Sequence, residues 1–192
     1  MRRLRQITLD PDTRPMLRAF RCAALAACCL TTGAAAQAAS PVTDAFREMA
    51  GRMDRNLVAA AEEMPAGKYG FKPTPAQMSF GEVIGHLAEG NDYFCANIGG
   101  VNAPKRAELA KDAGKDRLVA RLKESFQFCD TALAKADDSK LDAKLPFFGQ
   151  KEISRGAMIL AAAEDWGDHY SQLAIYLRLN GLLPPTAKKK QA

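Results

Sequence analysis

Apolar residues recur at helical spacing in four long segments of this chain, and this periodicity limits the possible folds more than any other feature. The expected helices span residues 41–64, 79–98, 115–136 and 154–180. An apolar residue at every third or fourth position gives each helix one face that must be buried. Four such faces can bury one another, so the sequence predicts an all-α protein with a four-helix bundle.

The ends of these helices carry recognisable start and stop signals. Ser40 followed by Pro41 is typical of a helix start with serine as the cap. Ser79 and Glu82 have the spacing of a capping box at the start of the second helix. The asparagine, glycine and two prolines in residues 180–185 end the fourth helix.

The first 38 residues have the pattern of a secretory signal peptide. Arginines lead into an apolar run over residues 22–30, and Ala36-Gln37-Ala38 matches the A-x-A pattern of a cleavage site. We therefore expect a periplasmic or secreted protein whose mature chain begins near residue 39. Residues 39–187 are predicted to form the bundle, and residues 188–192 a basic flexible tail.

Two details of this leader stay open. A lipoprotein would be cleaved before Cys28, but Arg21 would then leave an apolar run shorter than the ~7 residues expected. The start codon is either Met1 or Met16, because the aspartates and prolines before Met16 do not suit a signal peptide.

Charge is balanced in the predicted mature chain. From Ser40 onward there are 21 basic and 20 acidic residues, because six arginines precede that position. Nucleic-acid binding relies on a cationic surface, so we expect no nucleic-acid partner. No apolar run after the leader approaches the ~20 residues needed to cross a bilayer, so we expect no membrane span.

The chain has only two histidines, His86 and His169. Asp165 precedes His169 by four residues in the fourth predicted helix, so both side chains project from the same, otherwise apolar face. A carboxylate there requires a hydrogen bond, an ion pair or a metal ion. His86 lies about 120° from the centre of the apolar stripe of its helix, a position more typical of a cleft wall than of a core.

These residues allow two interpretations. In one, Asp165 and His169 form a buried hydrogen-bonded pair, and His86 is a surface residue without a role. In the other, the three side chains bind one divalent ion (zinc, nickel, manganese or iron) and leave one coordination position open. Tyr93 and Gln172 are then candidates for the surroundings of the ion or for substrate contact.

Several motifs resemble those of DinB-like four-helix-bundle proteins, a family of metal-dependent hydrolases that includes thiol-dependent transferases and isomerases. The matching stretches are KYGFKPTP at 68–75, SFGEVIGH at 79–86, HYSQL at 169–173 and YLRLNGLLPP at 176–185. The resemblance covers nearly all of the predicted mature chain.

The resemblance also implies a set of metal ligands. The family binds its ion with one histidine on the second helix, matched by His86, and with an H-x-x-x-H pair on the last helix. His169 matches the second histidine of that pair, whereas Asp165 replaces the first. Since aspartate is an accepted ligand for these metals, the site is either retained with altered charge or degenerate.

The topology determines whether Cys95 and Cys129 can meet. Both lie about 15 residues into their helices, so an antiparallel pair would separate them by roughly 20 Å, beyond disulfide reach. The long connection over 99–114 can retrace one helix length, and the resemblance implies an up-down-down-up bundle with the second and third helices parallel. A disulfide and two buried free thiols are then both open.

Two hypotheses of function follow. As an enzyme, the protein is a metal-dependent hydrolase or a thiol-dependent transferase that acts on an unidentified small molecule. As a non-catalytic protein, it is an envelope helical bundle with a degenerate metal site. The sequence leaves homodimer formation open, and it offers neither a serine-nucleophile motif nor a phosphate-binding glycine loop.

Overall fold

The computed structural model describes residues 40–110, 112–149 and 151–188. The predicted signal peptide, both candidate start codons and Cys28 lie outside this part of the chain, as do the last four residues of the predicted tail. The tail residue that is described, Lys188, forms an ion pair with Glu63 at 2.5 Å. Within the described ranges, no helix has the length and apolarity needed to cross a bilayer.

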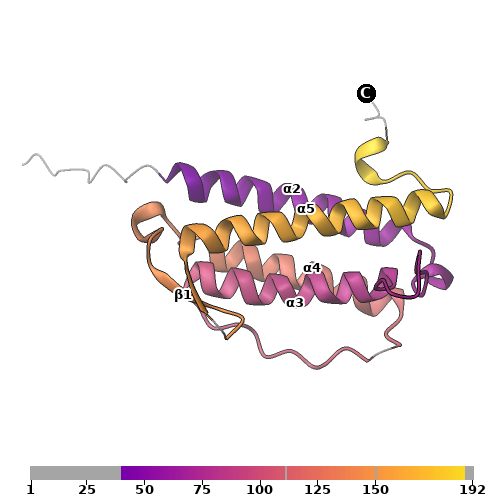
Figure 1. Cartoon of the computed structure of the whole chain (residues 1–192), viewed down its shortest axis with the longest axis horizontal. Coiled ribbons are helices and arrows are strands. Elements are labelled where there is room, and N and C mark those ends of the chain that lie inside the picture. The colour runs from indigo at the N-terminus through magenta and orange to yellow at the C-terminus, as the bar shows by residue number, and fades with distance from the viewer. Residues whose placement is uncertain (1–39, 111, 150, 189–192) are drawn as a thin grey trace, which may run out of the picture. The chain divides into compact units, whose positions relative to one another are not determined.

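Four long helices make up most of the described chain and confirm the predicted all-α bundle (Figure 1). They are α2 (Pro41–Glu63), α3 (Phe80–Gly99), α4 (Lys115–Leu133) and α5 (Arg155–Leu179). Short 3-10 turns η2, η3 and η4 cover Ala66–Lys68, Asp138–Lys140 and Pro185–Ala187.

The starts of the helices are fixed by local side-chain bonds. At α3 the capping box is complete, because Ser79 Oγ accepts from the Glu82 amide at 3.2 Å and the Glu82 carboxylate accepts from the Ser79 amide at 2.6 Å. At α2, Ser40 is the N-cap residue and Pro41 opens the helix, as expected, but the Ser40 side chain makes no capping hydrogen bond. The carboxylate of Asp138 takes that role and accepts from the amides of Val42 and Thr43, each at 2.9 Å.

A short hairpin precedes α5, where the sequence predicted only a connection. Strands β1 (Lys144–Phe147) and β2 (Lys151–Ser154) are antiparallel, with Lys144 opposite Ser154 and Phe147 opposite Lys151. Strands of four residues offer too little alternation to stand out from a loop. The hairpin places Phe148 at its turn, beside α3.

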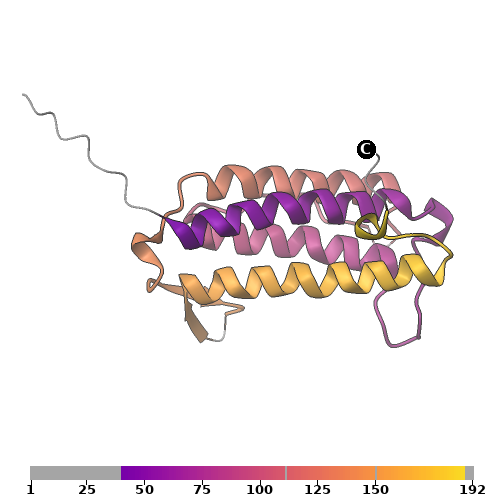
Figure 2. The ribbon, with the colours of Figure 1, turned by 90° about the horizontal axis from the view of Figure 1, so that it is seen from above.

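The helices form a ring in which α3 packs on α4 and α5, and α2 packs on the same two helices. Figure 2 shows the four running side by side. Contacts between α3 and α4 advance in the same direction, from Gly81 beside Leu118 to Gly99 beside Ala132. These two helices are therefore parallel, and the connection that joins them, described at residues 100–110 and 112–114, returns along the outside of the bundle beside α3 (Figure 1).

The core is filled from all four helices. Phe46 of α2 stacks on Trp166 of α5 with ring centroids 5.3 Å apart, and Phe126 of α4 lies 6.0 Å from the same indole. Among the largest fully buried side chains are Trp166, Tyr176, Phe80, Phe126, Leu57, Met64, Ile84 and Leu87.

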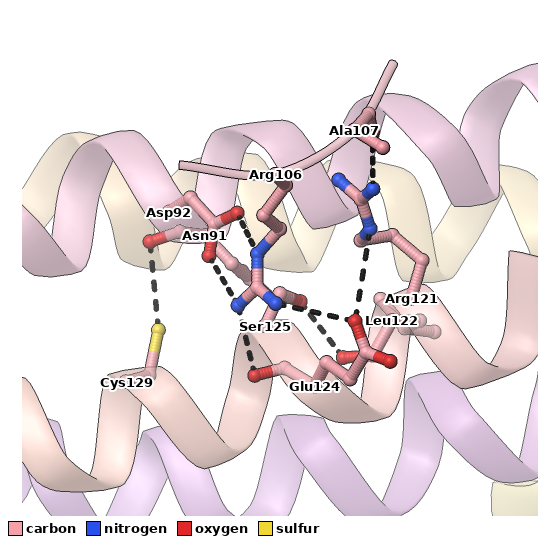
Figure 3. A network of polar contacts seen from close by, with 9 residues as sticks. All are labelled: Asn91, Asp92, Arg106, Ala107, Arg121, Leu122, Glu124, Ser125 and Cys129. Carbon is pink, nitrogen blue, oxygen red and sulfur yellow. Dashed lines mark hydrogen bonds and ion pairs between the residues drawn. The ribbon is translucent and has the colours of Figure 1, made fainter. Parts of the chain in front are cut away.

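The contact between α3 and α4 is closed by a disulfide and by an ionic network. Cys95 and Cys129 are bonded, with their Cα atoms 5.1 Å apart. Arg106 of the returning connection forms two hydrogen bonds with the Asp92 carboxylate and one of 3.2 Å with the Glu124 carboxylate (Figure 3). Arg106 thereby ties residues 100–114 to both helices.

Candidate metal centre

The antiparallel packing of α3 and α5 brings His86, Asp165 and His169 together. One potential ligand atom from each lies within 4.8 Å of the other two. Asp165 Oδ1 lies 3.9 Å from His86 Nε2 and 3.5 Å from His169 Nε2. The Nε2 atom of each imidazole thus faces the carboxylate. The two rings are 4.9 Å apart and nearly perpendicular.

The three side chains differ in their exposure. His86 is the outer member, with half of its side chain exposed, whereas the side chains of Asp165 and His169 are 20% and 10% exposed. A cavity of about 450 Å³ opens beside His86, between α3, the loop before it and the returning connection. His86 is the one candidate ligand that lines this cavity, and Asp165 and His169 lie behind it.

Asp165 Oδ2 is the most informative atom of the cluster. It is buried and has no hydrogen-bond partner among the described residues. A buried carboxylate oxygen without a partner is costly, and such groups are usually paired or bound to a cation. The other oxygen, Oδ1, is the one near the two imidazole nitrogens, and one carboxylate with two imidazoles fits the donor set of a divalent ion.

A polar relay fixes the orientation of His169. Tyr176 donates its hydroxyl hydrogen to the Met78 carbonyl at 2.9 Å, so its oxygen accepts from Gln172 Nε2 at 2.9 Å. The Gln172 Oε1 atom is then turned to His169 Nδ1 at 3.1 Å. Since Oε1 can only accept, Nδ1 must carry a hydrogen, and Nε2 faces Asp165. Gln172 therefore lies against His169, and its part in metal or substrate binding stays a prediction.

Asp165 also alters the basicity of His169. Its hydrogen bond raises the pKa of the imidazole, in opposition to burial, and the Gln172 bond adds to the increase. A proton on Nε2 therefore occupies the same place that a metal ion would take, so the two compete.

A buried bond next to Asp165 sets how α5 lies against α3. Trp166 Nε1 donates to Asn91 Oδ1 at 2.6 Å, and Asn91 Nδ2 donates to Ser125 Oγ at 2.9 Å. Trp166, Asn91 and Ser125 are fully buried. This contact was not predicted from the sequence, although an asparagine within an apolar stripe is a signal that could have revealed it.

Tyr93 lies apart from the three candidate ligands. Its hydroxyl donates to the Pro146 carbonyl at 2.9 Å and accepts from the Phe148 amide at 2.8 Å, both in the hairpin. Both bonds are to backbone atoms, so the hydroxyl holds the hairpin against α3. Substrate contact by the Tyr93 ring stays a prediction.

One class of helical-bundle proteins builds a central metal centre from side chains that project between facing helices. The three candidate ligands, which project between antiparallel helices, have this arrangement. The sequence model of the DinB superfamily matches residues 49–173, and this chain belongs to that superfamily. The resemblance found in the motifs is thereby confirmed.

Solved structures show the same fold. A DinB-like protein from Bacillus subtilis has 19% identity and a TM-score of 0.58, and the match covers 79% of this chain and 99% of that one. A DinB-like protein from Bacillus cereus has 15% identity and a TM-score of 0.60, with 74% and 95% covered. A mycothiol-dependent maleylpyruvate isomerase has 11% identity and a TM-score of 0.54, with 68% and 60% covered. No curated protein matches the sequence.

Proposed function

We propose that this chain is an exported DinB-superfamily protein that binds one divalent metal ion through His86, Asp165 and His169. We further propose that it acts on a small molecule as a metal-dependent hydrolase or as a thiol-dependent transferase. The observation that carries the proposal is that His86, Asp165 and His169 bring three ligand atoms together. Asp165 in this group has a buried oxygen without a hydrogen-bond partner in the described chain.

The donor set narrows the choice of ion. Two imidazoles and one carboxylate suit zinc, nickel, manganese or iron(II), and three protein ligands leave room for an exchangeable one. The half-exposed side of His86 supports placing that open position toward the solvent cavity.

The residues of the chain divide the work at such a centre. Gln172 would hold His169 with Nε2 turned toward the ion, and Asp165 would supply negative charge. Trp166 and its neighbours exclude water from the inner side. A divalent ion bound here would supply Lewis acidity, which lowers the pKa of a water or thiol beside it.

Thiol chemistry is supported by one of the similar structures. That protein is a mycothiol-dependent isomerase, and it shares the fold at low identity. Membership of the DinB superfamily supports metal binding in the same way. Neither comparison names a substrate for this chain, so the reaction is proposed only at the level of class.

A non-catalytic role is the alternative that one observation favours. Asp165 and His169 lie 3.5 Å apart and can form an ion pair without metal, because the carboxylate raises the pKa of the imidazole. A pair that is stable by itself could outlast a lost activity. In that case the protein would be an envelope bundle with a degenerate site.

Metal analysis separates the two roles. Purified protein is incubated with zinc, nickel, manganese or iron(II), dialysed and analysed for metal content. We expect one ion per chain in the wild type and none in His169→Ala, which keeps most of the core and should stay helical by circular dichroism. Asp168→Asn is the matched control, since Asp168 is an exposed neighbour on α5 and outside the cluster. A wild type that retains no metal would rule out the proposed centre.

Export has its own test. The predicted leader covers residues 1–38, and its arginines, apolar run and A-x-A pattern support a protein that works in the periplasm or outside the cell. The intact mass of protein recovered from the envelope fraction should correspond to a chain that begins near residue 39. A mass that includes the arginine-rich start would contradict export by cleavage.

A further inference from the structure

The turn of the β1–β2 hairpin has an unusual residue. Phe148 has a φ of 47°, the left-handed region, and it is the only residue other than glycine with a positive φ in the described chain. A bulky side chain is disfavoured there, and turns of this kind usually carry glycine or asparagine. The side chain is also 61% exposed, so burial does not compensate the cost of the backbone conformation.

The ring of Phe148 is nevertheless held in one place. It stacks on the ring of Tyr93 with centroids 4.8 Å apart and planes 16° apart, and it meets the edge of Phe94 at 6.1 Å. The two backbone bonds of the Tyr93 hydroxyl fix the turn from beneath. Tyr93 and Phe148, backed by the buried ring of Phe94, thus form a stacked apolar surface, called here the aromatic wall.

The aromatic wall lies on the same side of α3 as the candidate metal centre. Tyr93 follows His86 by seven residues, so it lies two turns and roughly 10 Å further along one face of the helix. Gly90 is the residue between them. A Cβ atom at Gly90 would lie 3.6 Å from Asp165 Oδ2 and 3.9 Å from the Phe94 ring.

Gly90 is partly exposed and carries no side chain, so α3 itself places no side chain between His86 and Tyr93 along this face. The His86–Asp165–His169 cluster lies at one end of the face, and the stacked aromatic surface lies at the other. Residues in sparsely populated conformations often mark ligand contacts, because the surrounding structure maintains them at a cost.

We propose that Phe148, supported by Tyr93, determines specificity by binding a planar apolar group of a small molecule whose polar end lies at the His86–Asp165–His169 centre. This proposal rests on the metal binding proposed above. It assigns a substrate class, namely molecules with a metal-binding head and an aromatic or similarly flat apolar body, and it gives the hairpin a role in recognition.

The probe pair is acetohydroxamate and biphenyl-4-hydroxamate, which bind metal through the same head and differ only in the aromatic body. Their affinities are measured by calorimetry with zinc-loaded wild type, Phe148→Gly and Leu183→Ala. Glycine accepts the left-handed conformation, so Phe148→Gly should fold at least as stably as the wild type. Leu183 is the matched control, because it is similarly exposed and follows α5 at the far end of the bundle.

We expect Phe148→Gly to lower the preference for the biphenyl probe by roughly 3- to 10-fold, in line with the strength of aromatic stacking. Acetohydroxamate affinity should stay unchanged in both variants, and Leu183→Ala should keep the full preference. An unchanged preference in Phe148→Gly would overturn the assignment while the metal centre stands.

Two other results would also count against the proposal. If the wild type sediments as a dimer that Phe148→Gly dissociates, and the probe preference is unaltered, then the ring serves a subunit contact. If zinc does not bind at all, the metal centre itself is wrong, and that failure appears before any hydroxamate is added.

Discussion

The two faces of α3 use polar groups in opposite ways. Toward α4, its polar side chains are paired: Asn91 bonds Ser125 and Asp92 bonds Arg106, with a disulfide beside them. On the side of α3 that packs against α5, Asp165 Oδ2 has no hydrogen-bond partner in the described chain. Both contacts are between helices of the same bundle. On the α4 side the buried Arg121 Nε also lacks a hydrogen bond, but it lies 3.9 Å from the Glu124 carboxylate, so the unmatched acidic group is on the α5 side.

This difference distinguishes polar groups that stabilise the fold from polar groups that are available to a ligand. Buried polar groups that hold a fold together are normally satisfied within the protein. A buried carboxylate that is left incomplete costs free energy, and the fold keeps it only if something else completes it. The α3–α4 contact therefore contributes to stability, and the α3–α5 contact carries the candidate metal centre.

Reduction of the Cys95–Cys129 disulfide should have the largest effect. The bond closes a loop with a sequence separation of 34, and removing that constraint should lower the free energy of unfolding by about 3–4 kcal/mol. Urea denaturation with and without reductant measures the loss. Metal retention by the reduced, still folded protein should be unchanged, and its loss would show that the two contacts are not independent.

Replacing one of two glycines on α3 by alanine should have the next largest effect on stability, and the two positions should differ. In Gly99→Ala the new Cβ would clash with the Ala132 backbone, with 2.8 Å to its carbonyl carbon, so we expect about 2–3 kcal/mol of destabilisation. In Gly90→Ala the nearest atom is 3.6 Å away, and the higher helix propensity of alanine should leave stability equal or up to about 1 kcal/mol higher. Equal losses in both variants, measured by thermal unfolding, would contradict the distinction between a packed and an open contact.

The relay to His169 gives a smaller effect that is confined to the α3–α5 side. Gln172→Leu removes the acceptor for His169 Nδ1 and should weaken metal binding about 10-fold, because such outer bonds orient metal-binding histidines. Competition with a chromogenic chelator gives the affinity. Ser171→Ala, an exposed neighbour whose hydroxyl bonds only its own helix, is the control and should bind as the wild type does.

The smallest effect concerns the capping of the start of α3. This helix takes part in both the α3–α4 and the α3–α5 contact. The backbone hydrogen bond from Ser79 and the bond with Lys72 lower the pKa of Glu82 to about 2. Because the folded pKa lies below the ordinary 4.5, the stabilisation is complete above pH 4.5 and is lost as the pH falls toward 2. Solvent screening of this exposed group keeps the effect below about 1 kcal/mol. Urea midpoints between pH 5 and pH 2 should fall less in Glu82→Gln than in the wild type.

The sequence was sufficient for the helices and for the candidate ligands. Helical periodicity and the Ser79–Glu82 capping box are local, so the bounds of α3 follow from adjacent residues. His86, Asp165 and His169 could be found because the chain offers few imidazoles and because a carboxylate in an apolar stripe is unusual.

The features that were missed depend on contacts distant in sequence. Asp138 caps α2 although it is distant from that helix in the sequence, and no residue pattern near position 138 predicts this role. The hairpin gains its stability from packing on Tyr93 rather than from its own short strands. The third helix was expected to reach residue 136 and ends at Leu133, because the last residues turn toward η3.

The parallel course of α2 and α5 has a consequence for rearranging the chain. Asp138, just before the hairpin and α5, caps the start of α2, while Lys188, after α5, pairs with Glu63 at the end of α2. Pro41 and Leu179 therefore lie at opposite ends of the bundle. A circular permutant that joins them must bridge the 23 residues of α2, roughly 35 Å at 1.5 Å per residue. A linker shorter than about 10 residues would be fully extended before it closed the circle, so one helix would have to unravel.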